Sequence, residues 1–80
     1  MNAVQAVAQR IDDLCKERQI TVNALSYMAA VPNSTIKSMF YGKSKNPGIT
    51  NIKKICDALG ITLGEFFSVK IFDSLEQEIK

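Results

Sequence analysis

Apolar residues recur at helical spacing over the first quarter of the chain. They lie three or four positions apart, at Val4, Val7, Ala8, Ile11, Leu14 and Cys15. This spacing puts them on one face of a helix, and the charged residues between them fall on the other faces. The pattern therefore predicts an amphipathic helix over residues 3–18.

Two shorter helices are predicted next. Thr21 favours the start of the second, because its hydroxyl can accept a hydrogen bond from a free backbone N–H of the first turn. This helix ends near Ala30, and its apolar face is Val22, Leu25 and Ala29. Pro32 suits a first helical turn but not a helix interior, so a third helix is expected over residues 32–41. Its apolar face is Ile36, Met39 and Phe40, and Gly42 is expected to end it as a left-handed cap.

The second half of the chain predicts two more helices and an ambiguous tail. Residues 43–48 read as a loop, and Thr50 is expected to cap a fourth helix that Gly60 stops. The apolar stripe of that helix is Ile52, Ile55, Cys56 and Leu59. Thr62 and Glu65 have the spacing of a capping box, which opens a fifth helix with Leu63, Phe66 and Phe67 as its apolar residues.

The predicted fold class is therefore all-α, with five helices in one domain over residues 1–68 and a C-terminal tail over residues 69–80. The tail carries apolar residues with both helical and strand-like spacing, so its structure stays open. They are Val69, Ile71, Phe72, Leu75 and Ile79. We find no internal repeat.

Composition narrows the function classes. The 80-residue chain has no histidine, which removes most acid–base, nucleophilic and zinc chemistry, so we expect no enzyme, no cofactor and no metal. Cys15 and Cys56 each lie in an apolar helical pattern and are read as small buried hydrophobes, with a reactive thiol as the alternative. There is neither a membrane-length apolar run nor a signal-peptide pattern, so we expect a cytoplasmic protein.

Charge is distributed unevenly along the chain. The net charge is only +2, but no acidic residue occurs between Arg18 and Cys56. That stretch holds six cations, Arg18, Lys37, Lys43, Lys45, Lys53 and Lys54. A cationic block of this kind favours a polyanionic partner, because each neutralised phosphate releases counterions. The alternative is a solvated face with an incidental gap in acids.

The feature most indicative of function is the pair of short helices joined at residues 30–32. A short helix, a tight turn and a second short helix form a helix-turn-helix, whose second helix enters the major groove of DNA. Small residues at the junction would let the helices approach closely, namely Ser26, Ala29 and Ala30. The inner face is expected to bury Val22, Leu25, Val31, Ile36 and Met39. Short polar side chains occupy the outer start of the third helix, where base edges would lie.

Residues 11–67 resemble the Cro and lambda-repressor-like (XRE) helix-turn-helix family. The segments GKSKNPGIT (residues 42–50) and ALGITLGEFF (residues 58–67) carry the resemblance most specifically. It implies a compact five-helix domain of a bacterial or phage-type transcriptional regulator, expected to be a repressor associated with the nucleoid. It also implies double-stranded DNA as the partner, bound as a homodimer on a two-fold-symmetric operator.

The resemblance assigns roles by position. The residues matching base-contacting positions are Asn33, Ser34, Thr35, Lys37 and Ser38. The expected chemistry is Asn to adenine, Ser or Thr to any base and Lys to guanine. The residues matching phosphate-contacting positions, with the start of the fourth helix included, are Tyr41, Lys43, Ser44, Lys45, Asn46, Thr50, Asn51 and Lys54.

Two departures from the family pattern bear on these roles. Ala30 stands where the turn usually has Gly, which costs about 1 kcal/mol if the backbone there is left-handed. Val22 stands where the family often has a Gln that anchors to a phosphate and supports a base contact. Asn23 is the candidate substitute for that phosphate contact, although its side chain points in a different direction.

The apolar tail residues are the predicted dimer or partner segment, since they are too many for a free tail. The alternative is that they fold back on the first helix. Two other functions stay open. One is an antitoxin-type autoregulator whose tail binds a toxin, and the other is a protein-interaction module that does not bind DNA.

Overall fold

Five α-helices and one short 3-10 helix follow one another in the computed structural model, which describes residues 1–41 and 46–79. Their bounds are α1 (Ala3–Glu17), α2 (Val22–Ala29), α3 (Asn33–Phe40), α4 (Ile49–Leu59), α5 (Leu63–Phe67) and η1 (Lys70–Phe72). No strand occurs in these two ranges. The all-α, five-helix prediction is confirmed, whereas the predicted cap at Gly42 lies outside the described residues.

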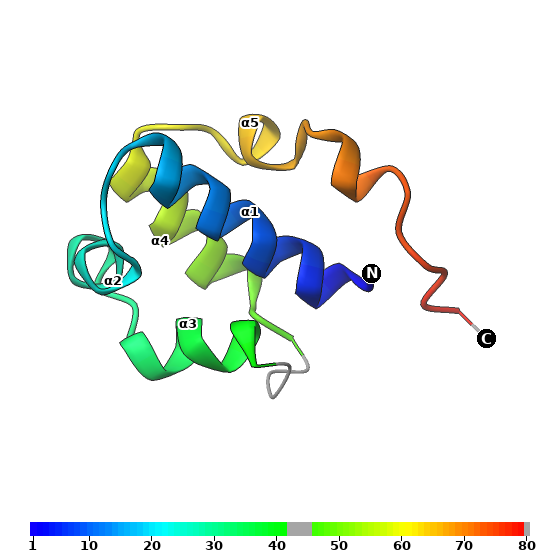
Figure 1. Cartoon of the computed structure of the whole chain (residues 1–80), viewed down its shortest axis with the longest axis horizontal. Helices are drawn as coiled ribbons and strands as arrows, with labels where there is room; N and C mark the ends of the chain where they lie inside the picture. Colours follow the sequence, from blue (N-terminus) through cyan, green and yellow to red (C-terminus); the bar gives the residue numbers. More distant parts are fainter. Residues whose placement is uncertain (42–45, 80) are drawn as a thin grey trace.

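The helices enclose one apolar core. α1 packs on α3, α2 packs on both α3 and α4, and α5 follows α4 across the opposite side of α1 from α3 (Figure 1). The predicted apolar stripes point inward, and the largest fully buried side chains come from every one of the five helices and the α2–α3 turn. They are Phe66, Ile11, Leu25, Ile36, Met39, Ile55, Val31 and Cys56. Periodicity therefore identified most of the core correctly. The exceptions are Val4, Val22 and Leu63, which are only half-buried, and Phe40 and Phe67, which are exposed.

The start of α4 differs from the prediction. The helix begins at Ile49 with Gly48 at the cap position, and the exposed Thr50 lies within its first turn. The prediction of Thr50 as the cap is wrong because loop hydrogen bonds set the helix start. The N–H of Gly48 donates to Oδ1 of Asn46 at 3.0 Å, and Nδ2 of Asn51 donates to the carbonyl of Pro47 at 3.2 Å.

One turn geometry ends three of the helices. Three residues just after a helix have a left-handed backbone. They are Gln19, Ala30 and Gly60, with φ values of 56°, 55° and 70°. The next residue then donates its N–H to a carbonyl five positions back, in the pairs Ile20–Cys15, Val31–Ser26 and Ile61–Cys56. These are Schellman motifs, each with an apolar residue after the left-handed position. The three corners therefore share one backbone geometry, although no internal sequence repeat accompanies them.

Two of these corners carry a residue that the left-handed backbone disfavours. Ala30→Gly and Gln19→Gly are each expected to raise the free energy of unfolding by about 1 kcal/mol, because glycine lacks the Cβ that crowds this conformation. Urea denaturation of the variants measures the change. Gly60→Ala is the matched reverse substitution and should lower stability by a similar amount. A loss of stability in Ala30→Gly would contradict the strain argument.

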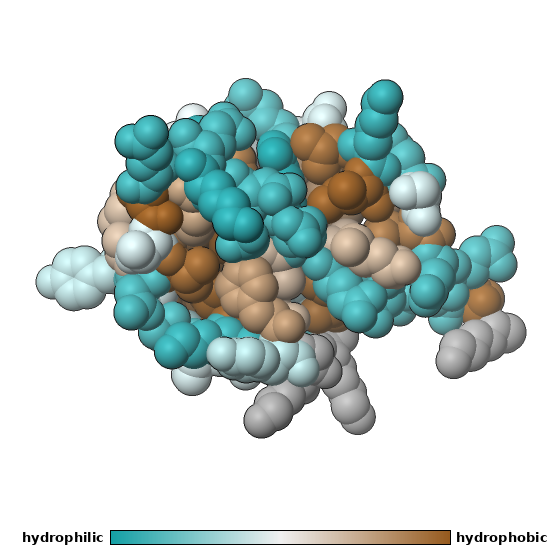
Figure 2. Space-filling view, in the orientation of Figure 1, coloured by the Kyte–Doolittle hydropathy of each residue, from teal (hydrophilic) through white to brown (hydrophobic). Residues whose placement is uncertain are grey.

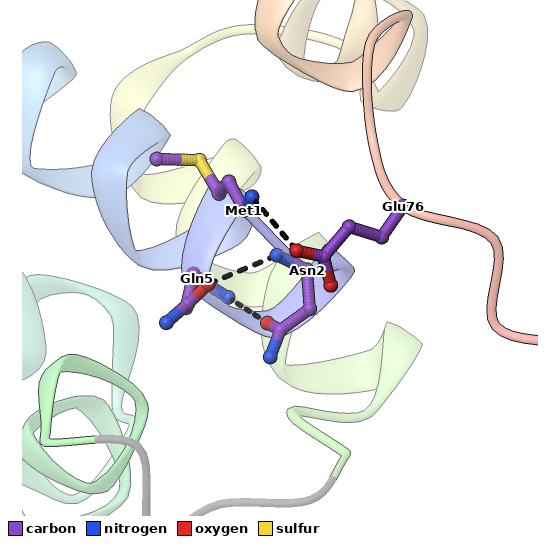
Figure 3. Close-up of polar contacts among 4 residues, drawn as sticks. All are labelled: Met1, Asn2, Gln5 and Glu76. Carbon is purple, nitrogen blue, oxygen red and sulfur yellow. Dashed lines mark hydrogen bonds and ion pairs between the residues drawn. The ribbon is translucent and has the colours of Figure 1, made fainter.

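The tail returns to the start of α1. Asn2 and Gln5 form a capping box there, with each side chain accepting the other's backbone N–H at 2.9 Å (Figure 3). The Glu76 carboxylate lies 3.4 Å from the Met1 ammonium group, and the Glu76 N–H donates to the Met1 carbonyl at 3.3 Å. The ring of Phe72, in η1, packs against the core. Over residues 69–79 the tail therefore forms neither a strand nor an α-helix, and it folds back toward α1 as far as Glu76.

Two arginines hold the ends of helices by capping backbone carbonyls. The Arg10 guanidinium donates to the carbonyls of Phe66 and Glu65, at 2.8 and 2.9 Å, at the end of α5. Arg18 donates to the carbonyl of Leu59 at 3.2 Å, at the end of α4. A cation near a helix C-terminus also complements the helix dipole. Arg18 thus has a structural role, although the sequence placed it in the cationic block.

The two cysteines are buried free thiols, as expected for small core residues. Burial raises the pKa of both, and the negative charge of Asp12 raises the pKa of Cys15 further. For Cys56, burial is again the largest influence on the pKa; Lys53 lowers the pKa and Asp57 raises it. Both thiols are therefore poor nucleophiles in the folded protein.

These raised pKa values predict an alkaline loss of stability. A thiol whose folded pKa lies above its unfolded pKa contributes stability that is complete below the unfolded pKa and is lost as the pH rises through the folded pKa. Urea denaturation between pH 7 and pH 10 should show a falling free energy of unfolding. The Cys15→Ala/Cys56→Ala variant should show a shallower fall. Equal slopes for the two proteins would contradict the assignment to the thiols.

Candidate nucleic-acid interface

α2 and α3 form a helix-turn-helix around the Ala30 corner. Leu25, Val31, Ile36 and Met39 are buried on its inner face, as predicted. Ser26 and Ala29 are also buried, which allows the close approach expected from their size. Ala30 is exposed, so its contribution is the left-handed turn rather than close packing. The turn is thus built without the usual glycine.

The outer start of α3 is polar and positively polarised. Ser34 and Lys37 are exposed, whereas Asn33, Thr35 and Ser38 are half-buried. No described side chain caps the first turn of α3, and the turn contains no acidic residue. Its N-terminal dipole therefore faces solvent without a compensating negative charge, an arrangement that suits an anionic partner.

Asn23 and Asn33 are joined by a side-chain hydrogen bond across the helix-turn-helix. Nδ2 of Asn33 donates to Oδ1 of Asn23, and Oδ1 of Asn33 is buried without a hydrogen-bond partner among the described residues. They help to line a shallow hollow between α2 and α3, with Ser26, Tyr27, Ala30, Val31 and Pro32. The sequence did not indicate this pairing, because ten positions separate the two residues and only the corner at Ala30 brings them together.

Ser38 is also held by an internal hydrogen bond. Its Oγ donates to the carbonyl of Ser34 at 2.7 Å, one helical turn earlier. This bond uses the single hydroxyl hydrogen, so the remaining hydrogen-bonding capacity of the side chain is its acceptor lone pairs.

The other predicted contact residues follow α3 in the chain, from its cap at Tyr41 to the first turns of α4. Tyr41, Asn46 and Thr50 are exposed, and Asn51 is half-buried. Oδ1 of Asn46 and Nδ2 of Asn51 are both engaged in the loop hydrogen bonds that start α4. Lys43, Ser44 and Lys45, which the sequence assigned to phosphate contacts, lie outside the described residues.

Fewer unpaired cations lie on the described surface than the acid-free stretch between Arg18 and Cys56 suggested. Lys53 pairs with Asp57 one turn along α4, and Arg18 caps α4. Lys37 and Lys54 are exposed and form no ion pair with any side chain in residues 1–41 and 46–79. These two lysines are therefore the described cations of the block that keep their charge unpaired.

The fold and the exposed polar helix define the helix-turn-helix class of DNA-binding domains. Residues 10–70 match the Cro/C1-type HTH DNA-binding domain, so the chain belongs to that family. It is also similar to the crystal structure of the prophage Lp1 protein 11, with 32% identity and a TM-score of 0.83. That match covers 94% of this chain and 100% of the other. Among curated protein sequences, none matches the chain.

Membership of this family implies binding to double-stranded DNA. None of the helices over residues 1–41 and 46–79 is both long and apolar enough to cross a membrane.

Proposed function

We propose that the protein is a sequence-specific regulator of transcription that acts as a repressor. The observation that carries this proposal is the outer start of α3, where short polar side chains surround a helix N-terminus without an acidic residue. Such a surface can approach the major groove closely, and a bound protein there blocks access to the DNA.

Base recognition is assigned to one surface of α3. The proposed base-contacting residues are Asn33, Ser34, Thr35, Lys37 and Ser38. The proposed phosphate-contacting residues are Tyr41, Asn46, Thr50, Asn51 and Lys54, together with Lys43, Ser44 and Lys45. Asn23 was the candidate for a further phosphate contact, and its bond to Asn33 favours a supporting role instead.

We further propose a homodimer, because one domain reads too few base pairs to be selective in a genome. The proposed dimer contact surface is formed by α5 together with the tail. Figure 2 shows apolar side chains reaching the surface over α5 and the segment that follows it. Ile79 is 90% exposed and Phe67 36% exposed, whereas Val69, Ile71 and Leu75 are half-buried. Phe72 packs on the domain's own core, so it is not expected at the centre of that surface.

Selection of bound sequences from a random duplex library tests DNA recognition. The purified protein is expected to enrich one two-fold-symmetric sequence, and binding to it should weaken steeply as the salt concentration rises. If no sequence is enriched and binding at physiological salt is negligible, the regulator proposal fails.

Two neighbouring lysines of α4 provide a matched prediction. Lys54→Ala should weaken binding to all sequences alike and reduce the slope of log affinity against log salt by about 1, because one phosphate contact is lost. Lys53→Ala should change the slope less, since Lys53 is paired with Asp57. Titrations at several salt concentrations give both slopes. A larger change for Lys53→Ala than for Lys54→Ala would contradict the assignment.

Mass in solution tests the dimer. The full chain is expected to be dimeric, and a chain ending at Asp73 should dissociate more readily, because it loses Leu75 and Ile79 but keeps Phe72 in the core. An unchanged dimer in the shortened chain would remove this part of the tail from the contact. A monomeric full chain, on and off DNA, would overturn the dimer itself.

A further inference from the structure

We infer that α3 reads its operator through a divided hydrogen-bonding code, in which Asn33 acts only as a donor and Ser38 only as an acceptor. Asn23 is the positioning residue that holds Asn33 in its donor orientation. The inference rests on the proposed function, because it specifies which atoms of the base edges the proposed surface recognises. It also changes the expectation that Asn33 contacts adenine to a contact with any base that offers an acceptor.

The donor assignment follows from how the Asn33 amide is held. A bidentate contact with adenine needs the amide oxygen to accept from N6 while the amide nitrogen donates to N7. Oδ1 of Asn33 is buried and has no partner among the described residues, so no base edge can reach it in this orientation. Nδ2 carries two hydrogens, of which one is donated to Oδ1 of Asn23. The other hydrogen is what Asn33 retains for a base.

Rotating the Asn33 amide would expose its oxygen at a cost. If the Asn33 amide alone turned, two amide oxygens would face each other, so the bond would be kept only if the Asn23 amide turned as well. Asn23 is therefore expected to act through Asn33 rather than through a phosphate. Without Asn23, the amide is released to turn either edge toward the groove.

The acceptor assignment follows from the helix-internal bond of Ser38. Its hydroxyl hydrogen is donated to the Ser34 carbonyl at 2.7 Å, so only its lone pairs remain for DNA. A serine in general can donate or accept, and the back-bond removes the first of these options here.

The two assignments predict different base preferences. In the major groove, adenine, guanine and thymine each present an acceptor, whereas cytosine presents only its N4 amino donor. On the contacted strand, Asn33 should therefore tolerate adenine, guanine and thymine and reject cytosine. Ser38 needs an amino group, so it should favour adenine or cytosine.

Base analogues in the selected operator test the code atom by atom. Asn33→Ala and Ser38→Ala first identify the position that each residue reads, as the position where base preference is lost. At the Asn33 position, adenine is compared with purine, which lacks the 6-amino group, and with 7-deazaadenine, which lacks the N7 acceptor. Loss of N7 should weaken binding about fivefold and loss of the amino group should leave it unchanged. With adenine placed at the Ser38 position, loss of the amino group should weaken binding and loss of N7 should leave it unchanged.

Variants of Asn23 test the positioning role. Asn23→Ala should alter base preference at the Asn33 position alone, with binding at other positions reduced uniformly or not at all. Asn23→Asp keeps an acceptor for Nδ2, so it should keep the preference pattern even though its charge lowers overall affinity. Ser38→Thr likewise keeps the hydroxyl and should keep the Ser38 preference.

The outcomes separate this inference from the proposed function. If an operator is selected but loss of the 6-amino group and loss of N7 weaken binding equally at the Asn33 position, Asn33 binds adenine through both atoms and the code is wrong. If Asn23→Ala lowers affinity without changing any base preference, Asn23 has no positioning role. If no operator is selected, the proposed function itself fails.

Discussion

Ser34→Asp is expected to stabilise the protein and to weaken DNA binding about a hundredfold. The added carboxylate lies in the first turn of α3, which has no acidic residue, so it complements the helix dipole and contributes about 0.5 kcal/mol. On the proposed DNA-facing surface, however, the same charge meets phosphates and acceptor atoms of base edges. Like charges brought together at an interface cost several kcal/mol. Urea denaturation and operator titration measure the two effects separately.

Two controls isolate the position and the charge. Ser34→Asn has a similar size without the charge and should weaken binding much less than Ser34→Asp. Gln77→Glu adds the same charge at an exposed tail residue and should change binding only slightly. If Ser34→Asp binds the operator as tightly as the unaltered protein does, α3 does not present this surface to DNA.

Phe66→Ala is expected to lower the free energy of unfolding by about 3–5 kcal/mol, because the substitution removes buried apolar area and leaves a cavity. Phe66 is 0% exposed and connects three parts of the fold. Its ring lies 4.9 Å from that of Phe67 and 6.1 Å from that of Phe72, and the Arg10 guanidinium lies 5.8 Å from its centroid. In a domain of this size a loss of 1 kcal/mol lowers the melting temperature by about 4–8 °C, so the melting temperature should fall by about 20 °C.

The adjacent aromatic residue is the matched control. Phe67 is partly exposed, so Phe67→Ala should cost about 1 kcal/mol through the lost ring contacts. Thermal and urea denaturation compare the two variants directly. Equal losses would mean that Phe66 does not hold the central position described here.

The fold was largely predictable because its helices follow local rules. Apolar periodicity places the buried faces of all five helices, and the Thr62–Glu65 capping box forms as expected. The start of α4 was not predictable, because a loop bond between Gly48 and Asn46 decides it rather than the hydroxyl of Thr50. The tail was ambiguous because its position depends on long-range contacts of Phe72 and Glu76.

The candidate site shows the same limit more sharply. The sequence indicates which residues line the outer start of α3, because helical spacing and the family resemblance are both local to the segment. It does not show that Asn23 holds Asn33 or that Arg18 is used at the end of α4. Those contacts join residues that are distant in sequence, so charge and composition alone overstate the number of cations left for DNA.

The repeated Schellman corners have a consequence for how fast the chain folds. Each corner is closed by hydrogen bonds between residues no more than five positions apart, so it can form before any long-range contact. Helical domains rich in local contacts fold in microseconds to milliseconds. The glycine variants then report the order of events. If Ala30→Gly speeds folding, the α2–α3 corner is present in the transition state, whereas slower unfolding alone would place its formation after the rate-limiting step.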